Sequence, residues 1–463
     1  MLSCGQADIS AGCQDSKTVD VCQVAEIQHC CCDQLENIVA VQQDVTIAPL
    51  RSTSEVNLGS VQFIDGSLFC IDDSVRRLKL DALVAVGGDI NLQQCPRMGH
   101  LFFSELTQVW GSILLDGNSA LGKLELHRVS TVGASISCSN CNDLSELQLN
   151  ELTSLGGSLI ITGASLSSVS LGNLRHIGGS VNMEDSNIDS IDFEQLTVIG
   201  GSLNLDNNGQ LSALRFAGLT RVGGDVSASS CSITFLSFGA LTHIGGSLLL
   251  QQNQLKSIDL SAIATLGGRL FLRHNELTSV HLGQMSVLRG SVNLAHNRLT
   301  TFALGAVTAV QGTLNLRSNQ LRYMSGDLLD IIAGTLIASE NNLSAVDFPR
   351  LVHVGGDVRL ASNELTAFFF PKLQTIGGEL DLSENDLTAA SFVQLTRVGA
   401  LNLAKNSLTS MQFGSLREIN GALDITGNDH LRAIDCSGVE IACVRADSHV
   451  DLGQSCPDLC VNV

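Results

Sequence analysis

The sequence predicts an all-β fold, a parallel β-solenoid of about eighteen coils with a cysteine-rich cap at each end. Two observations carry this prediction. A glycine pair or a single glycine recurs every 22 or 23 residues through most of the 463-residue chain, and apolar residues alternate at fixed positions after it. A fixed period in this range is the signature of stacked repeats, in which each unit buries its apolar face only against its neighbours.

The unit at residues 244–266 shows the pattern clearly. The alternation of Leu248 and Leu250 predicts a short strand with one buried face, and Ile258 and Leu260 predict a second strand. The glycine pair before the first strand permits a positive φ in a tight corner, where a Cβ would clash. We therefore expect two strands and a glycine corner in each coil.

An asparagine follows the first strand of most units. Because an inward amide at a bend can bond backbone groups that the turn leaves unpaired, stacked copies should form a ladder. The ladder positions are Asn118, Asn208, Asn253, Asn275, Asn297, Asn319, Asn341, Asn363, Asn385, Asn406 and Asn428. Cys95, Cys141 and Cys231 occupy the same register, and Cys70 and Cys138 occupy the second inward strand position. We therefore expect five buried thiols.

In three segments the sequence predicts local structure that differs from the general repeat. The spacing of Val21, Val24, Cys31 and Leu35 predicts a short helix. Gly326 interrupts the second alternating pair of its coil, and a helical turn is expected at 323–332. One register in four successive coils is phenylalanine, which predicts a buried aromatic column rather than a ligand slot: Phe348, Phe370, Phe392 and Phe413.

The flanking segments are rich in cysteine. The repeat array is expected at 38–430, with caps at 1–37 and 431–463. The N-terminal segment holds Cys4, Cys13, Cys22, Cys30, Cys31 and Cys32, and the C-terminal segment holds Cys436, Cys443, Cys456 and Cys460. Even numbers at both exposed core ends predict disulfide-stapled caps and an oxidising compartment, with the pairing open. Zinc is disfavoured, because His29, His430 and His449 lack finger spacing.

The repeat resembles known families. The pattern L-x-L-x-x-N-x-L, with cysteine sometimes replacing asparagine, is similar to the leucine-rich repeat. The stretches DFPRLVHVGGDVRLASNELTAF and FFPKLQTIGGELDLSENDLTAA resemble the receptor L domain, the repeat module of insulin-receptor and EGF-receptor ectodomains and of some fungal cell-wall glycoproteins. The resemblance covers roughly residues 38–430. It implies a right-handed β-helix or horseshoe, an extracellular or cell-surface setting, and protein or glycan binding.

Composition and motifs exclude several functions. The net charge of −20 disfavours nucleic-acid binding, because phosphate contacts need clustered Lys and Arg. The chain has no P-loop, HExxH, GxSxG or dinucleotide fingerprint, so we expect no enzyme and no cofactor. An acidic cluster lacks calcium-loop spacing and is expected to be a solvated face: Glu184, Asp185, Asp189, Asp192 and Glu194.

The two ends of the sequence carry information on the cellular compartment of the protein. MLSCGQADIS has neither the basic start nor the apolar stretch of a signal peptide. We expect a fragment of a secreted protein, and the alternative is an intracellular protein with reduced thiols. CPDLCVNV has no apolar tail, so no membrane span or GPI signal is expected. Asn342 begins the sequon Asn342-Leu343-Ser344 and should point outward, which makes it a glycosylation candidate.

A basic and apolar patch is the candidate ligand surface. Its members lie at outward strand positions or directly after them, and they are Leu249, Phe271, Arg273, His274, His296, Arg298 and Arg317. Exposed apolar residues ringed by arginine are enriched at protein interfaces. The leading hypothesis is therefore an extracellular or cell-surface recognition or adhesion module that binds a protein or glycan on the sheet face. The alternatives are a structural cell-wall or matrix repeat protein and an intracellular leucine-rich-repeat scaffold.

Overall fold

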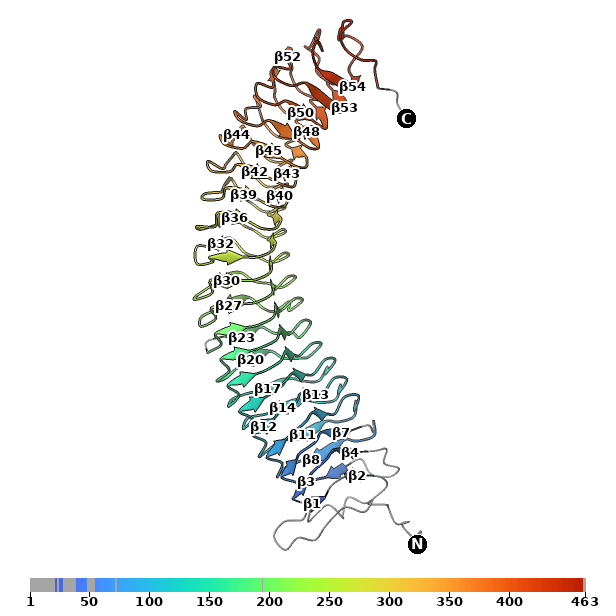
Figure 1. The fold of residues 1–463 in the computed structure, drawn as a ribbon, viewed down its shortest axis with the longest axis vertical. Coiled ribbons are helices and arrows are strands. Elements are labelled where there is room, and N and C mark those ends of the chain that lie inside the picture. The colour runs from blue at the N-terminus through green and yellow to red at the C-terminus, as the bar shows by residue number, and fades with distance from the viewer. Residues whose placement is uncertain are drawn as a thin grey trace. The chain divides into compact units, whose positions relative to one another are not determined.

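The computed structural model describes residues 21–22, 25–27, 39–47, 55–70, 73–193 and 195–460. It divides into two compact units, Met1–Ile244 and Gly245–Val463. The described ranges contain no helix, and in each unit short strands pair in parallel with the equivalent strands of the next coil (Figure 1). The predicted parallel β-solenoid of about eighteen coils is confirmed.

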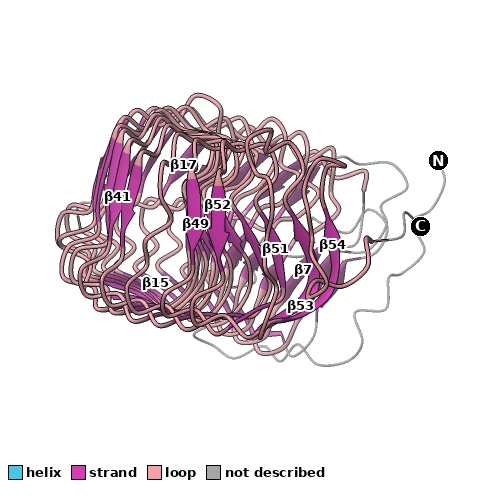
Figure 2. Ribbon diagram, turned by 90° about the horizontal axis from the view of Figure 1, so that it is seen from above, coloured by secondary structure: helices cyan, strands magenta, loops and turns pink. Residues whose placement is uncertain are grey.

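Each coil contributes strands to as many as three faces, one more than the sequence predicts. Face 1 precedes the glycine corner, face 2 follows it, and face 3 is the second alternating pair. In a view along the stack the strands gather on separate sides of the coils (Figure 2). The strands of face 1 have a single inward apolar residue in most coils, so alternation does not reveal them.

The first unit has three runs of strands. Face 1 comprises β1 (Val21–Cys22), β3 (Ala40–Val41), β6 (Phe63–Ile64), β9 (Ala85–Val86), β12 (Gln108–Val109), β15 (Thr131–Val132), β18 (Ser154–Leu155), β21 (His176–Ile177), β24 (Val198–Ile199), β27 (Arg221–Val222) and β30 (His243–Ile244). Face 2 comprises β2 (Ala25–Ile27), β4 (Val45–Ile47), β7 (Leu68–Cys70), β10 (Ile90–Asn91), β13 (Ile113–Leu114), β16 (Ile136–Ser137), β19 (Leu159–Ile160), β22 (Val181–Asn182), β25 (Leu203–Asn204) and β28 (Val226–Ser227). Face 3 comprises β5 (Glu55–Asn57), β8 (Arg77–Lys79), β11 (His100–Phe102), β14 (Lys123–Glu125), β17 (Glu146–Gln148), β20 (Ser168–Ser170), β23 (Ser190–Asp192), β26 (Ala213–Arg215) and β29 (Phe235–Ser237).

The second unit repeats this arrangement. Face 1 comprises β33 (Thr265–Leu266), β36 (Val287–Leu288), β39 (Ala309–Val310), β42 (Ile331–Ile332), β45 (His353–Val354), β47 (Thr375–Ile376), β50 (Arg397–Val398) and β53 (Glu418–Asp424), which continues into face 2. Face 2 comprises β31 (Leu248–Leu249), β34 (Leu270–Phe271), β37 (Val292–Asn293), β40 (Leu314–Asn315), β43 (Leu336–Ile337), β46 (Val358–Arg359), β48 (Glu379–Asp381), β51 (Ala400–Asn402) and β54 (Glu440–Arg445). Face 3 comprises β32 (Ser257–Asp259), β35 (Ser279–His281), β38 (Thr301–Ala303), β41 (Tyr323–Ser325), β44 (Ala345–Asp347), β49 (Ala389–Ser391) and β52 (Ser410–Gln412).

The asparagine ladder forms as predicted. The Asn319 Oδ1 accepts the N–H of Leu299 at 3.1 Å, and its Nδ2 donates to the carbonyl oxygens of Leu294 and Leu316 at 3.0 Å each. The same set of bonds recurs at Asn275, Asn297, Asn341, Asn363, Asn385, Asn406 and Asn428. Each ladder amide therefore pairs backbone groups of its own coil and of the coil before it.

The glycine corners differ from the prediction. The described glycine pairs do not have a positive φ, and the prediction that they would is wrong. Glycine is needed there because the coils stack closely: a Cβ at Gly156 would lie 1.9 Å from the carbonyl oxygen of Gly133. The left-handed residue of a coil instead comes directly before the ladder position, as at Ser318 (φ 54°) and Lys405 (φ 54°).

A second ladder, made of hydroxyl groups, follows the glycine corner. The Ser135, Ser158 and Ser180 Oγ atoms accept the backbone N–H of Ser158, Ser180 and Ser202, at 2.9 to 3.0 Å. Sequence analysis did not find this ladder, although serine recurs after the glycine pairs. It ties the outer edge of each corner to the next coil.

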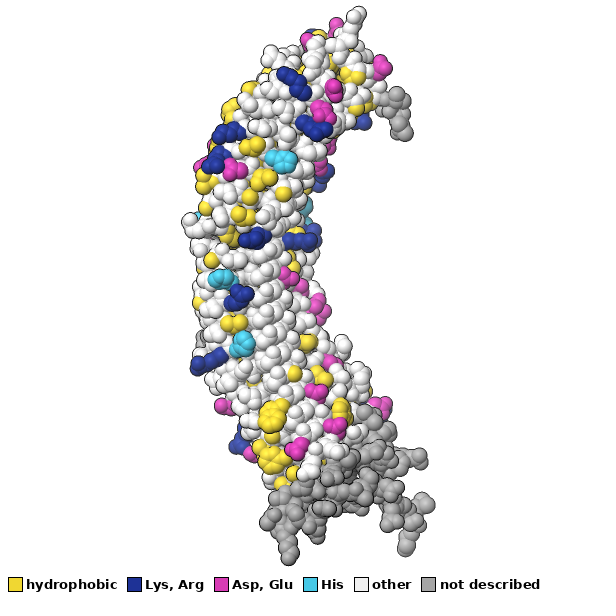
Figure 3. All heavy atoms as spheres, viewed as in Figure 1, with side chains coloured by type: hydrophobic (Ala, Val, Ile, Leu, Met, Phe, Trp, Pro, Cys, Tyr) yellow, Lys and Arg dark blue, Asp and Glu magenta, His cyan; other side chains and the backbone are white. Residues whose placement is uncertain are grey.

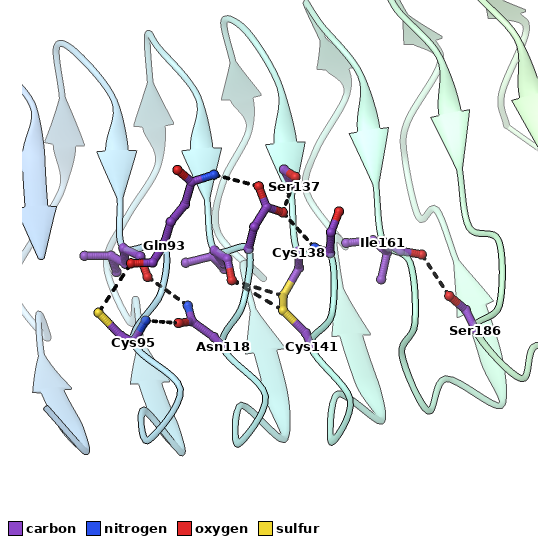
Figure 4. The surroundings of a disulfide bond; sticks show 12 residues. Gln93, Cys95, Asn118, Ser137, Cys138, Cys141, Ile161 and Ser186 are labelled. Carbon is purple, nitrogen blue, oxygen red and sulfur yellow. Dashed lines mark hydrogen bonds between the residues drawn. A yellow bond between two sulfur atoms is a disulfide. The ribbon is translucent and has the colours of Figure 1, made fainter. Parts of the chain in front are cut away.

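The core cysteines divide into two kinds. Cys70, Cys95 and Cys231 are buried thiols, as predicted, and burial raises the pKa of Cys231 to about 11. The prediction of thiols at Cys138 and Cys141 is wrong, because these two form a disulfide (Figure 4). They occupy the strand and ladder positions of one coil, in a C-x-x-C motif whose Cα atoms lie 5.7 Å apart.

The C-terminal segment contains two disulfides. Cys436 pairs with Cys456, and Cys443 in β54 pairs with Cys460. The Cys443–Cys460 bond ties β54 to the chain that follows it, and the Cys436–Cys456 bond joins the segments before and after this strand. The N-terminal candidates Cys4, Cys13, Cys30, Cys31 and Cys32 lie outside the described residues, and the side chain of Cys22 is likewise not described.

Two local expectations of helix are wrong. Residues 323–325 form β41, because Met324 fills an inward position of face 3 and is fully buried. Within 21–35 the described residues are the strands β1 and β2, which pair with β3 and β4. The predicted burial is confirmed for all four phenylalanines, and the Phe348 and Phe370 ring centroids are 5.9 Å apart. The column is not continuous, because Phe368 lies between Phe370 and Phe392, at 4.7 Å and 6.0 Å from their ring centroids.

Candidate functional site

The predicted patch lies on face 2 of the second unit and on the bend that follows it. Leu249 in β31 is opposite Phe271 in β34, and both are half-buried with outward side chains. Arg273 and His274 come next in the chain after β34 and are exposed. The structure therefore brings Leu249, Phe271, Arg273 and His274 together on adjacent coils.

Two histidines of the patch stack on each other. The His274 and His296 ring centroids are 4.5 Å apart, and the planes differ by 3°. Both residues have the left-handed conformation of the ladder bend, with φ of 55° and 57°, which places their side chains one above the other. Burial and the neighbouring side chains of His296 and Arg273 lower the pKa of His274. This shift favours the neutral form of its imidazole ring.

The positive charges of the other two arginines predicted for the patch, Arg298 and Arg317, are neutralised by ion pairs. Arg298 pairs with Glu276 at 3.3 Å, on the corner beyond the ladder residue Asn297. Arg317 pairs with Glu340, and this contact and Ser318 lower the pKa of Glu340 to about 2. Because both guanidinium groups already have carboxylate partners, they contribute little positive charge to a ligand.

Two further arginines, which the sequence analysis did not include, complete the patch. The segment Arg269-Leu270-Phe271-Leu272-Arg273 alternates, with both leucines buried and both arginines exposed. The Arg269 guanidinium carbon lies 5.7 Å from the centre of the Phe271 ring. Arg289 is exposed at the glycine corner of the next coil. We call Arg269, Phe271, Arg273, His274, Arg289 and His296 the basic strip.

The three arginines of the basic strip lack carboxylate partners. Among the residues that the structure describes, no carboxylate forms an ion pair with Arg269, Arg273 or Arg289, a property that they share with about half of the described lysines and arginines. The alternation of Arg269, Phe271 and Arg273 along the chain could have been read from the sequence. The neutralisation of Arg298 and Arg317 could not, because their partners lie 22 or 23 residues away.

The asparagines on the same face have a structural role. The Asn293 Oδ1 accepts the N–H of Ala295 at 3.1 Å, and the Asn315 Oδ1 accepts that of Arg317 at 3.0 Å. These bonds shape the chain after the strand. The outward asparagines of this face therefore have a structural role and do not need a ligand to explain them. The exposed side chains of the basic strip have no such structural role.

Metal and membrane sites were also sought. Within the described ranges, no three His, Cys, Asp or Glu side chains gather in a way that could hold a metal ion. The described segments likewise include no helix that is long and apolar enough to cross a membrane. The candidate site is therefore defined by surface charge and one aromatic ring.

Solved structures with a similar fold are leucine-rich repeat proteins. One from Bacteroides eggerthii matches with a TM-score of 0.40 and 12% identity, over 85% of this chain and 68% of its own. YopM from Yersinia enterocolitica matches with a TM-score of 0.36 and 18% identity, over 89% and 87%. A protein of Leptospira interrogans matches with a TM-score of 0.33 and 18% identity, over 66% and 88%. No protein-family model and no curated protein matches the chain.

The geometry of the chain itself identifies the repeat. A short strand with inward leucines leads into a bend closed by a buried asparagine, whose amide bonds the backbone of two successive coils. This unit recurs every 22 or 23 residues with the pattern L-x-L-x-x-N-x-L. The chain is a leucine-rich repeat solenoid.

Proposed function

We propose that the chain is an extracellular recognition module that binds a partner protein through the basic strip. The observation that carries the proposal is a set of three exposed arginines without carboxylate partners among the described residues, in a chain with a net charge of −20. Arg269 lies near the Phe271 ring, Arg273 follows the same strand, and Arg289 lies at the corner of the next coil. Charges that a fold keeps unpaired on one surface are suited to a partner of opposite sign.

The chemistry of the strip favours an acidic protein segment. Guanidinium groups bind carboxylates in a planar, bidentate way, and arginine and aromatic residues are enriched among the residues that dominate binding energy. Arg269 precedes β34 and lies near the Phe271 ring, and Arg273 follows the same strand by two residues. An apolar side chain flanked by two carboxylates would match this arrangement.

The disulfides support an extracellular or cell-surface setting. Three disulfides lie in the described residues, two of them at the C-terminal end of the second unit. Disulfides persist in oxidising compartments and are rare in the cytosol. The finer resemblance to the receptor L domain points to the same setting and stays a prediction.

The test uses purified chain against an array of extracellular protein ectodomains. Phe271→Ala with Arg273→Ala should weaken any interaction found by at least about tenfold, and the affinity of the unchanged chain should fall with added salt. The matched control is Phe235→Ala with Arg215→Ala, a second Arg–Phe pair whose guanidinium carbon lies 4.7 Å from the ring centre.

The control pair lies on face 3 of the first unit, so its replacement should leave the affinity unchanged. Equal affinity of both double variants would remove the basic strip as the binding surface. Self-association without any heterologous partner would favour the structural alternative, in which the solenoid acts by stacking.

A further inference from the structure

The only tryptophan of the chain is exposed at a corner of the first unit. Trp110 follows β12 and precedes β13, and 69% of its surface is accessible. Exposed hydrophobic side chains lie on the visible face of this part of the molecule (Figure 3). A large aromatic residue in this position adds almost nothing to the core.

The neighbouring coils carry glycine at the same corner, for a steric reason. A Cβ at Gly87 would lie 2.1 Å from the carbonyl oxygen of Asp65, and one at Gly133 would lie 2.0 Å from that of Trp110. Stacking at this corner therefore favours glycine in most coils, although Asp65, Arg289, Gln311 and Ala333 also occupy this register. A bulky residue that breaks a local structural rule without packing into the core marks a functional position.

Two carboxylates and a second exposed aromatic ring lie in the two coils before Trp110. Asp89 stands in the preceding coil, where its Oδ1 accepts the N–H of Ser112 at 2.6 Å, and Asp65 is exposed two coils before Trp110 in the same register. Phe63 in β6 is 42% exposed. Its strand is two coils from β12, a separation of about 10 Å.

We propose that Trp110 is the platform of a carbohydrate-binding site on the first unit. The flat, partly positive C–H face of a pyranose ring stacks on the indole, whose face is negative. The Asp89 carboxylate accepts hydrogen bonds from sugar hydroxyl groups, and Phe63 contacts a further sugar of the same oligosaccharide. Gly87 and Gly133 leave the two edges of the indole open to a chain that runs across the coils.

A protein partner fits this surface less well. The centre of a protein interface is depleted of charged residues and is built from a contiguous apolar area. Around Trp110 the neighbouring positions are instead glycine, aspartate and serine, namely Gly87, Gly133, Asp65, Asp89 and Ser112. Two exposed aromatic rings with carboxylates in the neighbouring coils suit a ligand rich in hydroxyl groups. The site is separate in sequence and in chemistry from the basic strip and does not rest on it.

The single tryptophan provides a direct measurement. Its fluorescence emission is recorded while the full chain is titrated with cellohexaose, laminarihexaose, chitohexaose and mannohexaose. A saturable change in intensity or wavelength with at least one of these probes is expected. Calorimetric titration of the variants follows, in which Trp110→Gly should lower the affinity at least about tenfold and Asp89→Asn should lower it by a smaller factor.

The variants are chosen so that folding does not confuse the result. Trp110→Gly installs the residue that the adjacent coils carry, so its urea unfolding midpoint should equal or exceed that of the unchanged chain. Phe235→Ala, which removes an exposed aromatic residue of face 3, should bind as the unchanged chain does. The proposal is overturned if no probe changes the emission at millimolar concentration, or if Trp110→Gly binds as tightly as the unchanged chain.

Discussion

Each ladder asparagine satisfies several buried backbone groups at once. The Asn341 Nδ2 donates to the carbonyl oxygens of Leu316 and Ala338 at 3.1 Å each, and its Oδ1 accepts the N–H of Leu321 at 3.0 Å. Its immediate neighbour Asn342 is exposed and donates to Glu364 at 2.8 Å. Two identical residues thus stand side by side, one inside the solenoid and one outside it.

This pair allows a matched comparison. Asn341→Ala leaves the buried N–H of Leu321 without a partner, and it removes one of the two amide donors of the Leu316 and Ala338 carbonyl oxygens, which keep Asn319 and Asn363. The free energy of unfolding should therefore fall by about 1–3 kcal/mol. Asn342→Ala removes one exposed contact and should change it by less than about 0.5 kcal/mol. Urea unfolding of the two variants measures the difference, and similar losses for both would show that the ladder does not stabilise the bends.

The same residue, Asn342, is the first position of the sequon. Its exposure on an outer corner leaves the amide accessible to a transferase, and Ser344 lies beside it. We keep it as the candidate glycosylation site of a secreted form. The Ala variant described above would remove that glycan together with the contact to Glu364.

At the scale of a structural element, the corner glycines set how closely coils approach. At Gly156 an added Cβ would meet backbone atoms of the preceding coil, and the nearest is 1.9 Å away. At Gly122 an added Cβ would have no heavy atom within 4 Å. Two glycines of one unit thus differ only in whether a neighbouring coil occupies the space.

Substitution by alanine should separate the two positions. Gly156→Ala forces the corner apart and should lower the free energy of unfolding by about 1–3 kcal/mol. Gly122→Ala meets no obstacle and should be neutral, or stabilising by up to about 1 kcal/mol, because alanine restricts the unfolded chain. Thermal unfolding of both variants measures this, and equal stability would contradict the close stacking seen at the corner.

Elements that repeat were predictable from the sequence, and those that occur once were not. The strand of face 2, the ladder and the buried phenylalanines recur in many coils, so their pattern averages over local exceptions. The strands of face 1 were missed because each has a single inward apolar residue, such as Val86 in β9, whereas the inward residues of face 2, such as Leu248 and Leu250, continue past the strand. The Cys138–Cys141 disulfide was missed because both residues fit the repeat register as buried thiols, although they also form a C-x-x-C motif.

The candidate site was predictable only in part, for a related reason. Outward residues follow from strand alternation, which placed Phe271 and Arg273 correctly on face 2. Whether an arginine is available to a ligand depends on side-chain contacts between coils, and these paired Arg298 with Glu276 and Arg317 with Glu340. Trp110 attracted no functional prediction because a single residue outside the consensus gives no pattern.

At the scale of the whole molecule, the cysteines distinguish an oxidised from a reduced protein. Peptide mass spectrometry without reduction should find Cys436 joined to Cys456, Cys443 to Cys460 and Cys138 to Cys141. Cys70, Cys95 and Cys231 should stay unmodified by iodoacetamide until the protein is unfolded, because they are buried and the thiolate is the reactive form. Free thiols at all described positions would instead support an intracellular scaffold.

The ladder also gives the stack a direction. From Asn275 to Asn428 each ladder amide bonds backbone groups of the coil before its own, as Asn428 does with Leu403 and Leu408. A nascent chain emerges from its N-terminal end, so each bend is completed only when the next coil has been synthesised. Removing whole coils from the C-terminal side leaves the last remaining bend with a backbone N–H that no asparagine pairs. Removing coils from the N-terminal side instead leaves all remaining backbone N–H groups of the bends paired and deprives only the first remaining asparagine of its partners. The C-terminal side of the array is therefore the one with the unpaired bend, and the disulfides Cys436–Cys456 and Cys443–Cys460 lie on that side.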